Sequence, residues 1–195
     1  MIVKRTWLWP LLGGVALLQS GALFSTVYER HRLLQSGREV TLAVRPIDPR
    51  DIFRGDYVTL GYDIGRLTKS GTESDPDFVG FVRGANVFIT LSPKPEGGWI
   101  QTDIASTYPA NVSPGNIVLK GTVLSTWTPP DSAETTANIR YGIEQYFVPE
   151  GTGRVLEQMV RDHKIEAIVA VAPDGTTALK GLVIDGKRHE DPPLL

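Results

Sequence analysis

The sequence predicts a mainly β protein, an antiparallel barrel or sandwich of about eight strands with one short helix, preceded by a single N-terminal transmembrane helix. Three observations support this fold class. Residues 6–28 form a run without a charged side chain. Much of the remaining chain alternates apolar and polar residues at the two-residue period of a strand. Its 14 prolines and 20 glycines divide these stretches at short intervals, as turns do in an all-β domain.

The composition bounds the class of protein. A chain of 195 residues fits one globular domain plus an attachment. Its net charge of -2 lacks the excess of positive charge that holds a phosphate backbone, so we expect no nucleic-acid partner. The absence of cysteine excludes disulfides, thiolate metal sites and a cysteine nucleophile.

The N-terminal apolar run is long enough to cross a membrane. As a helix rising about 1.5 Å per residue, residues 6–28 exceed the roughly 30 Å thickness of the hydrocarbon core. Trp7, Trp9 and Tyr28 stand at its ends, where aromatic side chains favour the headgroup region. The alternative is a cleavable signal peptide, because residues 20–22 are small. We favour an uncleaved anchor, since the apolar run continues past that point.

The orientation of the anchor follows from its position more than from charge. Lys and Arg are nearly balanced across its two ends, so the positive-inside rule does not decide. A short basic tail followed at once by an apolar run is typical of a signal-anchor. We therefore expect residues 1–32 to form the anchor with a short juxtamembrane helix, and residues 33–195 to form an extracytoplasmic β domain.

The first half of the domain contains the best-defined alternations. The anchor helix continues through residues 29–35 and ends at Ser36-Gly37. Residues 38–45 alternate as a strand, and a turn-rich stretch joins them to a half-buried strand over residues 57–64. On this second strand one face carries Val58, Leu60, Tyr62 and Ile64.

The next strands are separated by proline and glycine turns. Residues 78–91 predict one bent strand or two short ones, because two glycines interrupt them. A turn at residues 93–98 and a strand over residues 99–104 complete a hairpin. A further strand follows at residues 117–127.

The C-terminal part contains the only helix predicted outside the anchor. Residues 138–148 predict one strand and residues 152–161 an amphipathic helix. Residues 164–171 and 176–184 form the clearest hairpin, around Pro173-Asp174-Gly175. A polar tail closes the chain.

Two short stretches carry a family resemblance. Residues 55–62 read Gly-Asp-Tyr-Val-Thr-Leu-Gly-Tyr, which matches Gly-Asp-Tyr-x-x-Leu-x-Tyr. The chain resembles the GDYXXLXY family of bacterial membrane-anchored proteins, which is named for this pattern, and residues 141–151 resemble the second signature of that family. The resemblance implies the bacterial inner membrane and no particular reaction. The signal-anchor pattern then places the C-terminal domain on the extracytoplasmic or periplasmic side.

Charged and aromatic residues gather in and around the two signatures. In the structural interpretation, the carboxylates accept hydrogen bonds from nearby donors and the tyrosines fill the core. In the functional interpretation, the two signatures lie side by side and present a recognition surface. We favour the structural role, and expect Asp56 and Glu144 to satisfy donors rather than transfer protons. The candidate cluster consists of Asp48, Arg50, Asp51, Arg54, Gly55, Asp56, Tyr57, Leu60, Tyr62, Tyr141, Glu144 and Glu150.

The sequence assigns no catalytic, cofactor-binding or metal-binding residue. His31, His163 and His189 lack ligand spacing, and Gly151-Thr152-Gly153 lacks the remaining residues of a phosphate loop. We therefore expect a non-enzymatic accessory or binding domain that serves another membrane or envelope protein. The alternative is a membrane-tethered hydrolase with a signal-peptidase-like β-fold, because residues 54–58 are similar to a strand motif of that fold. That chemistry needs a serine beside a lysine base, for which the sequence offers no matching pattern.

Overall fold

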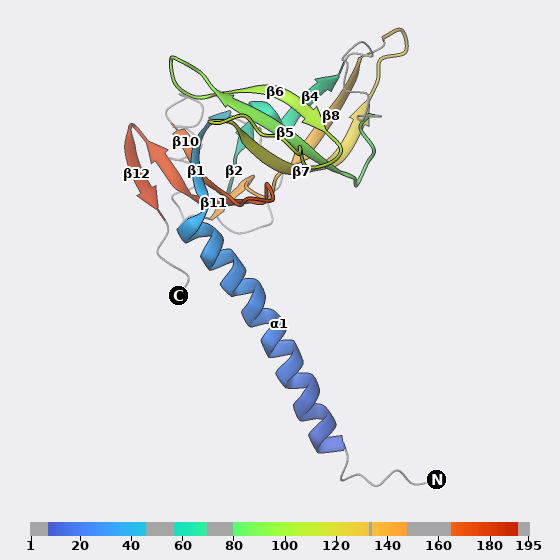
Figure 1. Cartoon of the computed structure of the whole chain (residues 1–195), viewed down its shortest axis with the longest axis vertical. Coiled ribbons are helices and arrows are strands. Elements are labelled where there is room, and N and C mark those ends of the chain that lie inside the picture. The colour runs from blue at the N-terminus through green and yellow to red at the C-terminus, as the bar shows by residue number, and fades with distance from the viewer. Residues whose placement is uncertain (1–7, 46–56, 70–79, 133, 148–164, 191–195) are drawn as a thin grey trace.

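One long helix, a 3₁₀ turn at Asp63–Gly65 and twelve strands are the regular elements of the part of the chain that the computed structural model describes, residues 8–45, 57–69, 80–132, 134–147 and 165–190 (Figure 1). The prediction of a mainly β protein behind one N-terminal helix is confirmed. The predicted number of strands, about eight, is too low. The elements are α1 (Leu8–Ser36), β1 (Arg38–Arg45), β2 (Tyr57–Thr59), β3 (Gly61–Tyr62), β4 (Arg66–Lys69), β5 (Asn86–Pro93), β6 (Trp99–Ala105), β7 (Ile117–Trp127), β8 (Thr135–Arg140), β9 (Gln145–Phe147), β10 (Ile165–Val171), β11 (Thr177–Ile184) and β12 (Lys187–Glu190).

Helix α1 projects away from the β domain as a single rod (Figure 1). Its 29 residues span about 43 Å at the usual helical rise. The stretch Trp9–Ser36 is long and apolar enough to cross a membrane, and none of its most apolar window is buried against the protein. The predicted end at Ser36-Gly37 is confirmed. Gly37 N–H donates to the Leu33 carbonyl, and a side chain at Gly37 would start only 2.6 Å from that oxygen.

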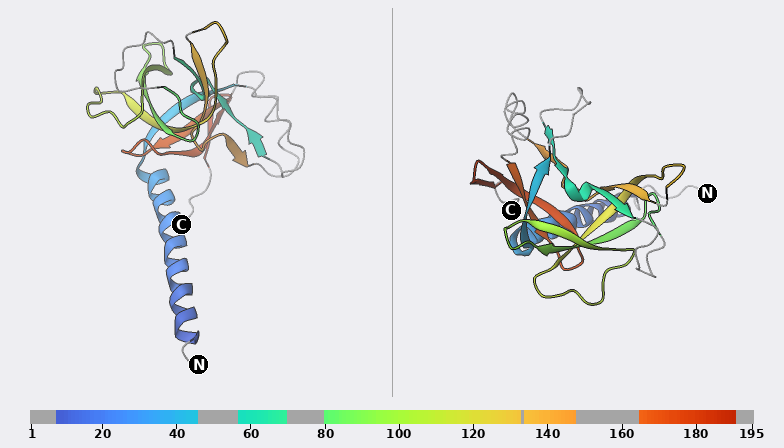
Figure 2. Two further views of the ribbon diagram at one scale, coloured as in Figure 1. Left: turned by 90° about the vertical axis from the view of Figure 1, so that its right-hand side faces the viewer. Right: turned by 90° about the horizontal axis from the view of Figure 1, so that it is seen from above.

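Two five-stranded antiparallel sheets enclose one core. Their strand orders are β12-β11-β10-β1-β3 and β4-β8-β7-β5-β6, and a separate pair joins β2 to β9. The sheets are curled (Figure 2), and one cluster of buried side chains draws on both of them, as the predicted barrel or sandwich requires. The core draws on both sheets, with Val40 and Leu42 on one side and Ile89 and Leu119 on the other.

Both predicted hairpins are present. Strands β5 and β6 pair across residues 94–98, and β10 pairs with β11 across the turn at residues 172–176. In that second turn, the carboxylate of Asp174 accepts hydrogen bonds from the backbone N–H and the hydroxyl of Thr176. These bonds hold the pKa of Asp174 below its usual value, the backbone N–H being the main cause.

Both predicted signature strands are broken in the structure. The strand expected over residues 57–64 ends at Thr59, and β3 resumes at Gly61 in a different sheet. The strand expected over residues 138–148 divides into β8 and β9, because Gly142 has a φ of +82° that no strand residue adopts. The predicted burial of Val58, Leu60 and Tyr62 is nevertheless confirmed, although Gly61 is buried too and Ile64 is only partly buried, so the strict alternation ends at the break.

Two further expectations are corrected, and a third is not tested. Within residues 80–91, the described part of this stretch, only Asn86 and the residues after it form a strand, because a turn closed by Ala85 N–H on the Val82 carbonyl precedes it. The predicted polar tail includes strand β12, which pairs along β11. The helix predicted over residues 152–161 lies outside the described residues.

Candidate functional site

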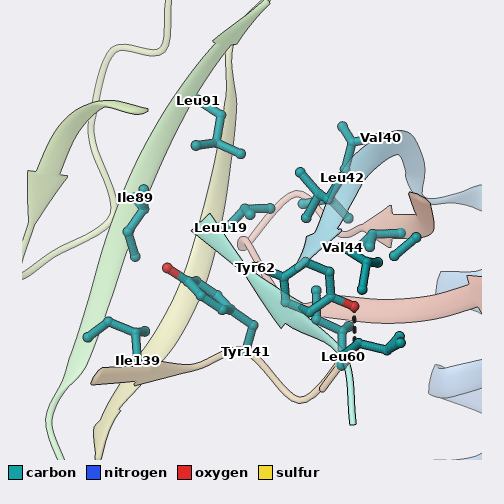
Figure 3. Packing of buried hydrophobic residues seen from close by; sticks show 14 of the residues in the cluster. Val40, Leu42, Val44, Leu60, Tyr62, Ile89, Leu91, Leu119, Ile139 and Tyr141 are labelled. Atoms are coloured by element: carbon teal, nitrogen blue, oxygen red, sulfur yellow. Dashed lines mark hydrogen bonds between the residues drawn. The ribbon is translucent and has the colours of Figure 1, made fainter. Parts of the chain in front are cut away.

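The structure brings together those members of the predicted cluster whose side chains it describes. These are Leu60, Tyr62, Tyr141 and Glu144, which hydrogen bonds within and between the two signatures bring together. Figure 3 shows Leu60 and the two tyrosines. The backbone of Tyr57 lies in β2, opposite Phe147. Seven predicted residues lie outside the described residues: Asp48, Arg50, Asp51, Arg54, Gly55, Asp56 and Glu150.

We name the meeting point the signature junction, defined as Leu60, Tyr62, Tyr141, Ile143 and Glu144. Both tyrosine rings lie among buried aliphatic side chains (Figure 3). Leu60 and Ile143 are fully buried, and the Leu60 N–H donates to the Glu144 carbonyl over 2.8 Å. The junction therefore belongs to the core of the domain.

The two tyrosines brace the signatures reciprocally. The Tyr62 hydroxyl donates to the Ile143 carbonyl at 2.8 Å, which reaches from the first signature to the second. The Tyr141 hydroxyl donates to the Ile64 carbonyl at 2.6 Å, which reaches back to the residues after the first. A buried carbonyl without a donor is costly. Each hydroxyl thus satisfies a backbone group of the other segment and holds the two together.

The Glu144 carboxylate binds the irregular backbone between β8 and β9. One carboxylate oxygen accepts the Tyr141 N–H and the other accepts the Gly142 N–H, at 2.9 Å. These two N–H groups have left the strand ladder, so the carboxylate replaces the partners that a continuous strand would have supplied. This geometry agrees with the expected role of Glu144 as an acceptor for nearby donors.

The environment keeps both tyrosines neutral. Burial raises the pKa of Tyr62 and of Tyr141 far above its ordinary value, and the negative charge of Glu144 raises it further. A phenol that stays protonated can donate its hydrogen bond at every physiological pH. The same shift makes these hydroxyls unsuited to act as bases near neutral pH.

Glycine at position 121 makes room for the second signature. A side-chain carbon there would lie 2.3 Å from a methyl carbon of Ile139 and 3.0 Å from the ring of Tyr141. Real side-chain contacts do not become this short, so β7 can pass the Tyr141 ring only with glycine at this point.

Two further residues contact the junction, and no sequence pattern predicted them. Thr177 on β11 is buried, and its hydroxyl donates to the Tyr141 carbonyl at 2.7 Å. Arg30 on α1 donates to the Thr177 carbonyl at 2.9 Å. Position 177 lies 36 residues from position 141 and 147 from position 30. Only the folded arrangement of β11 could reveal these contacts.

A small cavity lies at the end of the domain from which α1 emerges. Its volume is about 320 Å³, at the lower end of the usual range for ligand sites. The Arg38 guanidinium donates to the carbonyls of Gly115 and Asn116, at 2.7 Å each, and these bonds hold the loop before β7. Both polar and apolar side chains form its wall, including Ser36, Arg38, Tyr108, Val112, Asn116 and Pro173.

The hydrogen bonds of the signature junction connect side chains to the backbone. The polar groups of Tyr62, Tyr141 and Glu144 all bond to backbone groups. Within the described ranges, no group of three or more His, Asp or Glu side chains is placed to hold a metal ion. The arrangement can brace two segments and tie them to α1.

Fold and site together define the class of this protein, a braced β domain carried on one helix that is long and apolar enough to cross a membrane. The sequence profile described as GDYXXLXY protein matches residues 19–182, which is most of the chain. The chain belongs to the GDYXXLXY family. No curated protein and no solved structure matches it.

Proposed function

We propose that this protein is a single-pass envelope protein of the bacterial inner membrane whose periplasmic β domain serves, without catalysis, another membrane or envelope protein. The observation that carries the proposal is the form of α1. Its apolar length is exposed to the surroundings, and Arg30, near its C-terminal end, is hydrogen-bonded to the β domain. A helix of this kind suits a lipid environment and holds the domain beside the bilayer.

The signature junction supports the non-catalytic part of the proposal. Tyr62, Tyr141 and Glu144 direct their polar groups to the backbone, where each satisfies a donor or an acceptor of the fold. A catalytic acid or base must instead reach a substrate from a position that a ligand can enter. We therefore assign the two signatures a structural role and place binding on the surface of the domain.

The cavity beside α1 is our candidate for that surface. Beyond Tyr28, where the uncharged run ends, residues 29–36 extend α1 by about 12 Å. The cavity, which Ser36 borders, thus lies within reach of the extramembrane segments of an integral membrane protein. Tyr108 and Val112 are partly exposed at its edge, which places an aromatic and an aliphatic contact next to the Arg38 charge.

Fractionation and reporter fusions test the anchor and its orientation. The full chain should stay in the membrane fraction after an alkaline wash. Alkaline phosphatase fused after Leu195 should be active in whole cells, because that enzyme matures outside the cytoplasm. Release of the chain by the wash would disprove anchoring, and activity from cytoplasmic reporters alone would reverse the orientation.

Photo-crosslinking tests the binding surface. A photoreactive amino acid at Val112, on the edge of the cavity, should crosslink in cells to an integral membrane or envelope protein identified by mass spectrometry. Leu124 on β7 has similar exposure, 42% against 36%, and is the matched control. The same adducts from both positions, or none from Val112, would exclude the cavity as the docking surface.

A further inference from the structure

Helix α1 and the signature junction are joined by a short chain of hydrogen bonds. Arg30 on α1 donates to the carbonyl of Thr177, and the hydroxyl of Thr177 donates to the carbonyl of Tyr141. Two hydrogen bonds, through the single residue Thr177, thus join the helix to the second signature. Thr177 is 4% exposed, and Arg30 is half-buried where the helix meets β11.

The junction amides lie directly beyond this chain. The Tyr141 and Gly142 N–H groups bond to the Glu144 carboxylate, and the Leu60 N–H bonds to the Glu144 carbonyl. All three bonds depend on the backbone path between β8 and β9, which the Thr177 hydroxyl holds at the Tyr141 carbonyl. A shift of Thr177 therefore moves the anchor point of the second signature.

The end of α1 packs closely enough to transmit a displacement. A side-chain carbon at Gly37 would come within 3.0 Å of the Ala170 side chain on β10, which leaves little free space between the end of the helix and the sheet. Ala170 and Ala178, on adjacent strands, are fully buried and pair across β10 and β11. A well-packed contact between small side chains deforms little, so it passes strain onward.

We propose that α1 and the signature junction form one mechanical unit, in which a change in the tilt of α1 opens or closes the hydrogen bonds of the junction through Arg30 and Thr177. A membrane helix changes tilt when the bilayer thickness changes or when a neighbouring helix packs against it. The domain would then report the state of the membrane helix to whatever binds its surface. This inference rests on the proposed membrane position of α1.

Hydrogen exchange of the full chain in phosphatidylcholine nanodiscs tests the connection. Arg30→Met removes the bond to Thr177 and keeps an unbranched side chain. It should speed exchange of the Leu60, Tyr141 and Gly142 amides roughly 3- to 10-fold, the effect of losing about one hydrogen bond from a local opening. Arg32→Met changes an exposed arginine on the same helix and should leave these amides unchanged.

Two variants at position 177 separate the connection from a general loss of packing. Thr177→Val keeps the shape but removes the hydroxyl, so it should speed exchange of the same three amides. Thr177→Ser keeps the hydroxyl and should restore most of the protection. Amides of the β5–β6 hairpin should not respond to any of these changes. Equal exchange in all variants, or faster exchange throughout the domain, would overturn the proposal.

The bilayer itself supplies the final arm of the experiment. In the wild type, junction exchange should differ between nanodiscs of dimyristoyl- and dierucoyl-phosphatidylcholine, because the thin and thick bilayers impose different tilts on α1. Arg30→Met should abolish most of that difference. Identical exchange in both lipids, for a chain that co-elutes with the discs, would refute the coupling. A chain that fails to enter the discs would instead refute the anchoring on which the proposed function rests.

Discussion

Replacing Glu144 by alanine should destabilise the β domain by about 2 kcal/mol, within the range for charge-assisted hydrogen bonds. The carboxylate accepts two backbone N–H groups, those of Tyr141 and Gly142. The backbone there leaves the strand ladder at Gly142, whose φ is +82°, so no other strand can take over these donors.

The two lost bonds contribute unequally. The Tyr141 N–H bond is partly buried, so its loss should cost about 1.5–2 kcal/mol, near the value for a donor left without its charged partner. The Gly142 N–H bond is exposed, and water can replace the carboxylate there at about 0.5 kcal/mol or less. Glu144→Gln keeps one acceptor oxygen and should lose about half as much as Glu144→Ala.

Urea unfolding of the full chain in detergent, followed by tryptophan fluorescence, measures these differences. Glu96→Ala is the matched control, because Glu96 is an exposed glutamate in the turn between β5 and β6. If Glu144→Ala and Glu96→Ala unfold at the same urea concentration with the same slope, Glu144 does not brace the backbone. In that case its place in the signature would need a functional explanation.

Three other predictions follow from the same structure. Tyr62→Phe should cost about 1–2 kcal/mol at neutral pH, since the Ile143 carbonyl loses its donor. Burial, and then the nearby carboxylate, raise the pKa of Tyr62, so wild-type stability is complete below the unfolded pKa of about 10 and falls as pH rises above it. The difference in unfolding free energy between the wild type and Tyr62→Phe should therefore be smaller at alkaline pH than at neutral pH. A difference that stays constant with pH would contradict a neutral buried phenol. Gly121→Ala should cost about 3 kcal/mol or more by overpacking, whereas Gly65→Ala, with 4.0 Å to its nearest neighbour, should change the melting temperature little. Removing residues 1–28 should leave a soluble domain that unfolds cooperatively, and removing residues 1–32 should lower its stability by about 1 kcal/mol, because the hydrogen bond from the helix to β11 is lost. Equal stability of the two truncations would show that this bond contributes nothing.

Local patterns in the sequence predicted the elements whose physics is local. An uncharged run longer than the bilayer core predicts a helix like α1, and Ser36-Gly37 ends it where the structure does. The β10–β11 hairpin follows from a Pro-Asp-Gly turn between two apolar stretches, and the Asp174 bonds form within that turn. The alternation that buries Leu60 and Tyr62 follows from the two-residue period of extended backbone.

For the signature residues, the sequence predicted burial and hydrogen bonding but not the path of the backbone. The pattern correctly indicated that Leu60 and Tyr62 face inward, and that Glu144 accepts hydrogen bonds from nearby donors. It did not show that both signature strands break, because the breaks depend on which sheet each half joins. Strand β12 was not predicted, because its residues are exposed and show no alternation of apolar and polar side chains. They form a strand only by pairing along β11.

The tertiary structure alone determined which distant groups meet. Tyr62 and Ile143 lie 81 positions apart, and Arg30 and Thr177 lie 147 apart. No period or spacing in the sequence encodes such pairs, because each depends on the register of several strands at once. The sequence by itself therefore determined an apolar helix, a β domain and the inward face of its signature. The folded sheets decided that the two signatures brace each other and that the helix is connected to the second signature through Thr177.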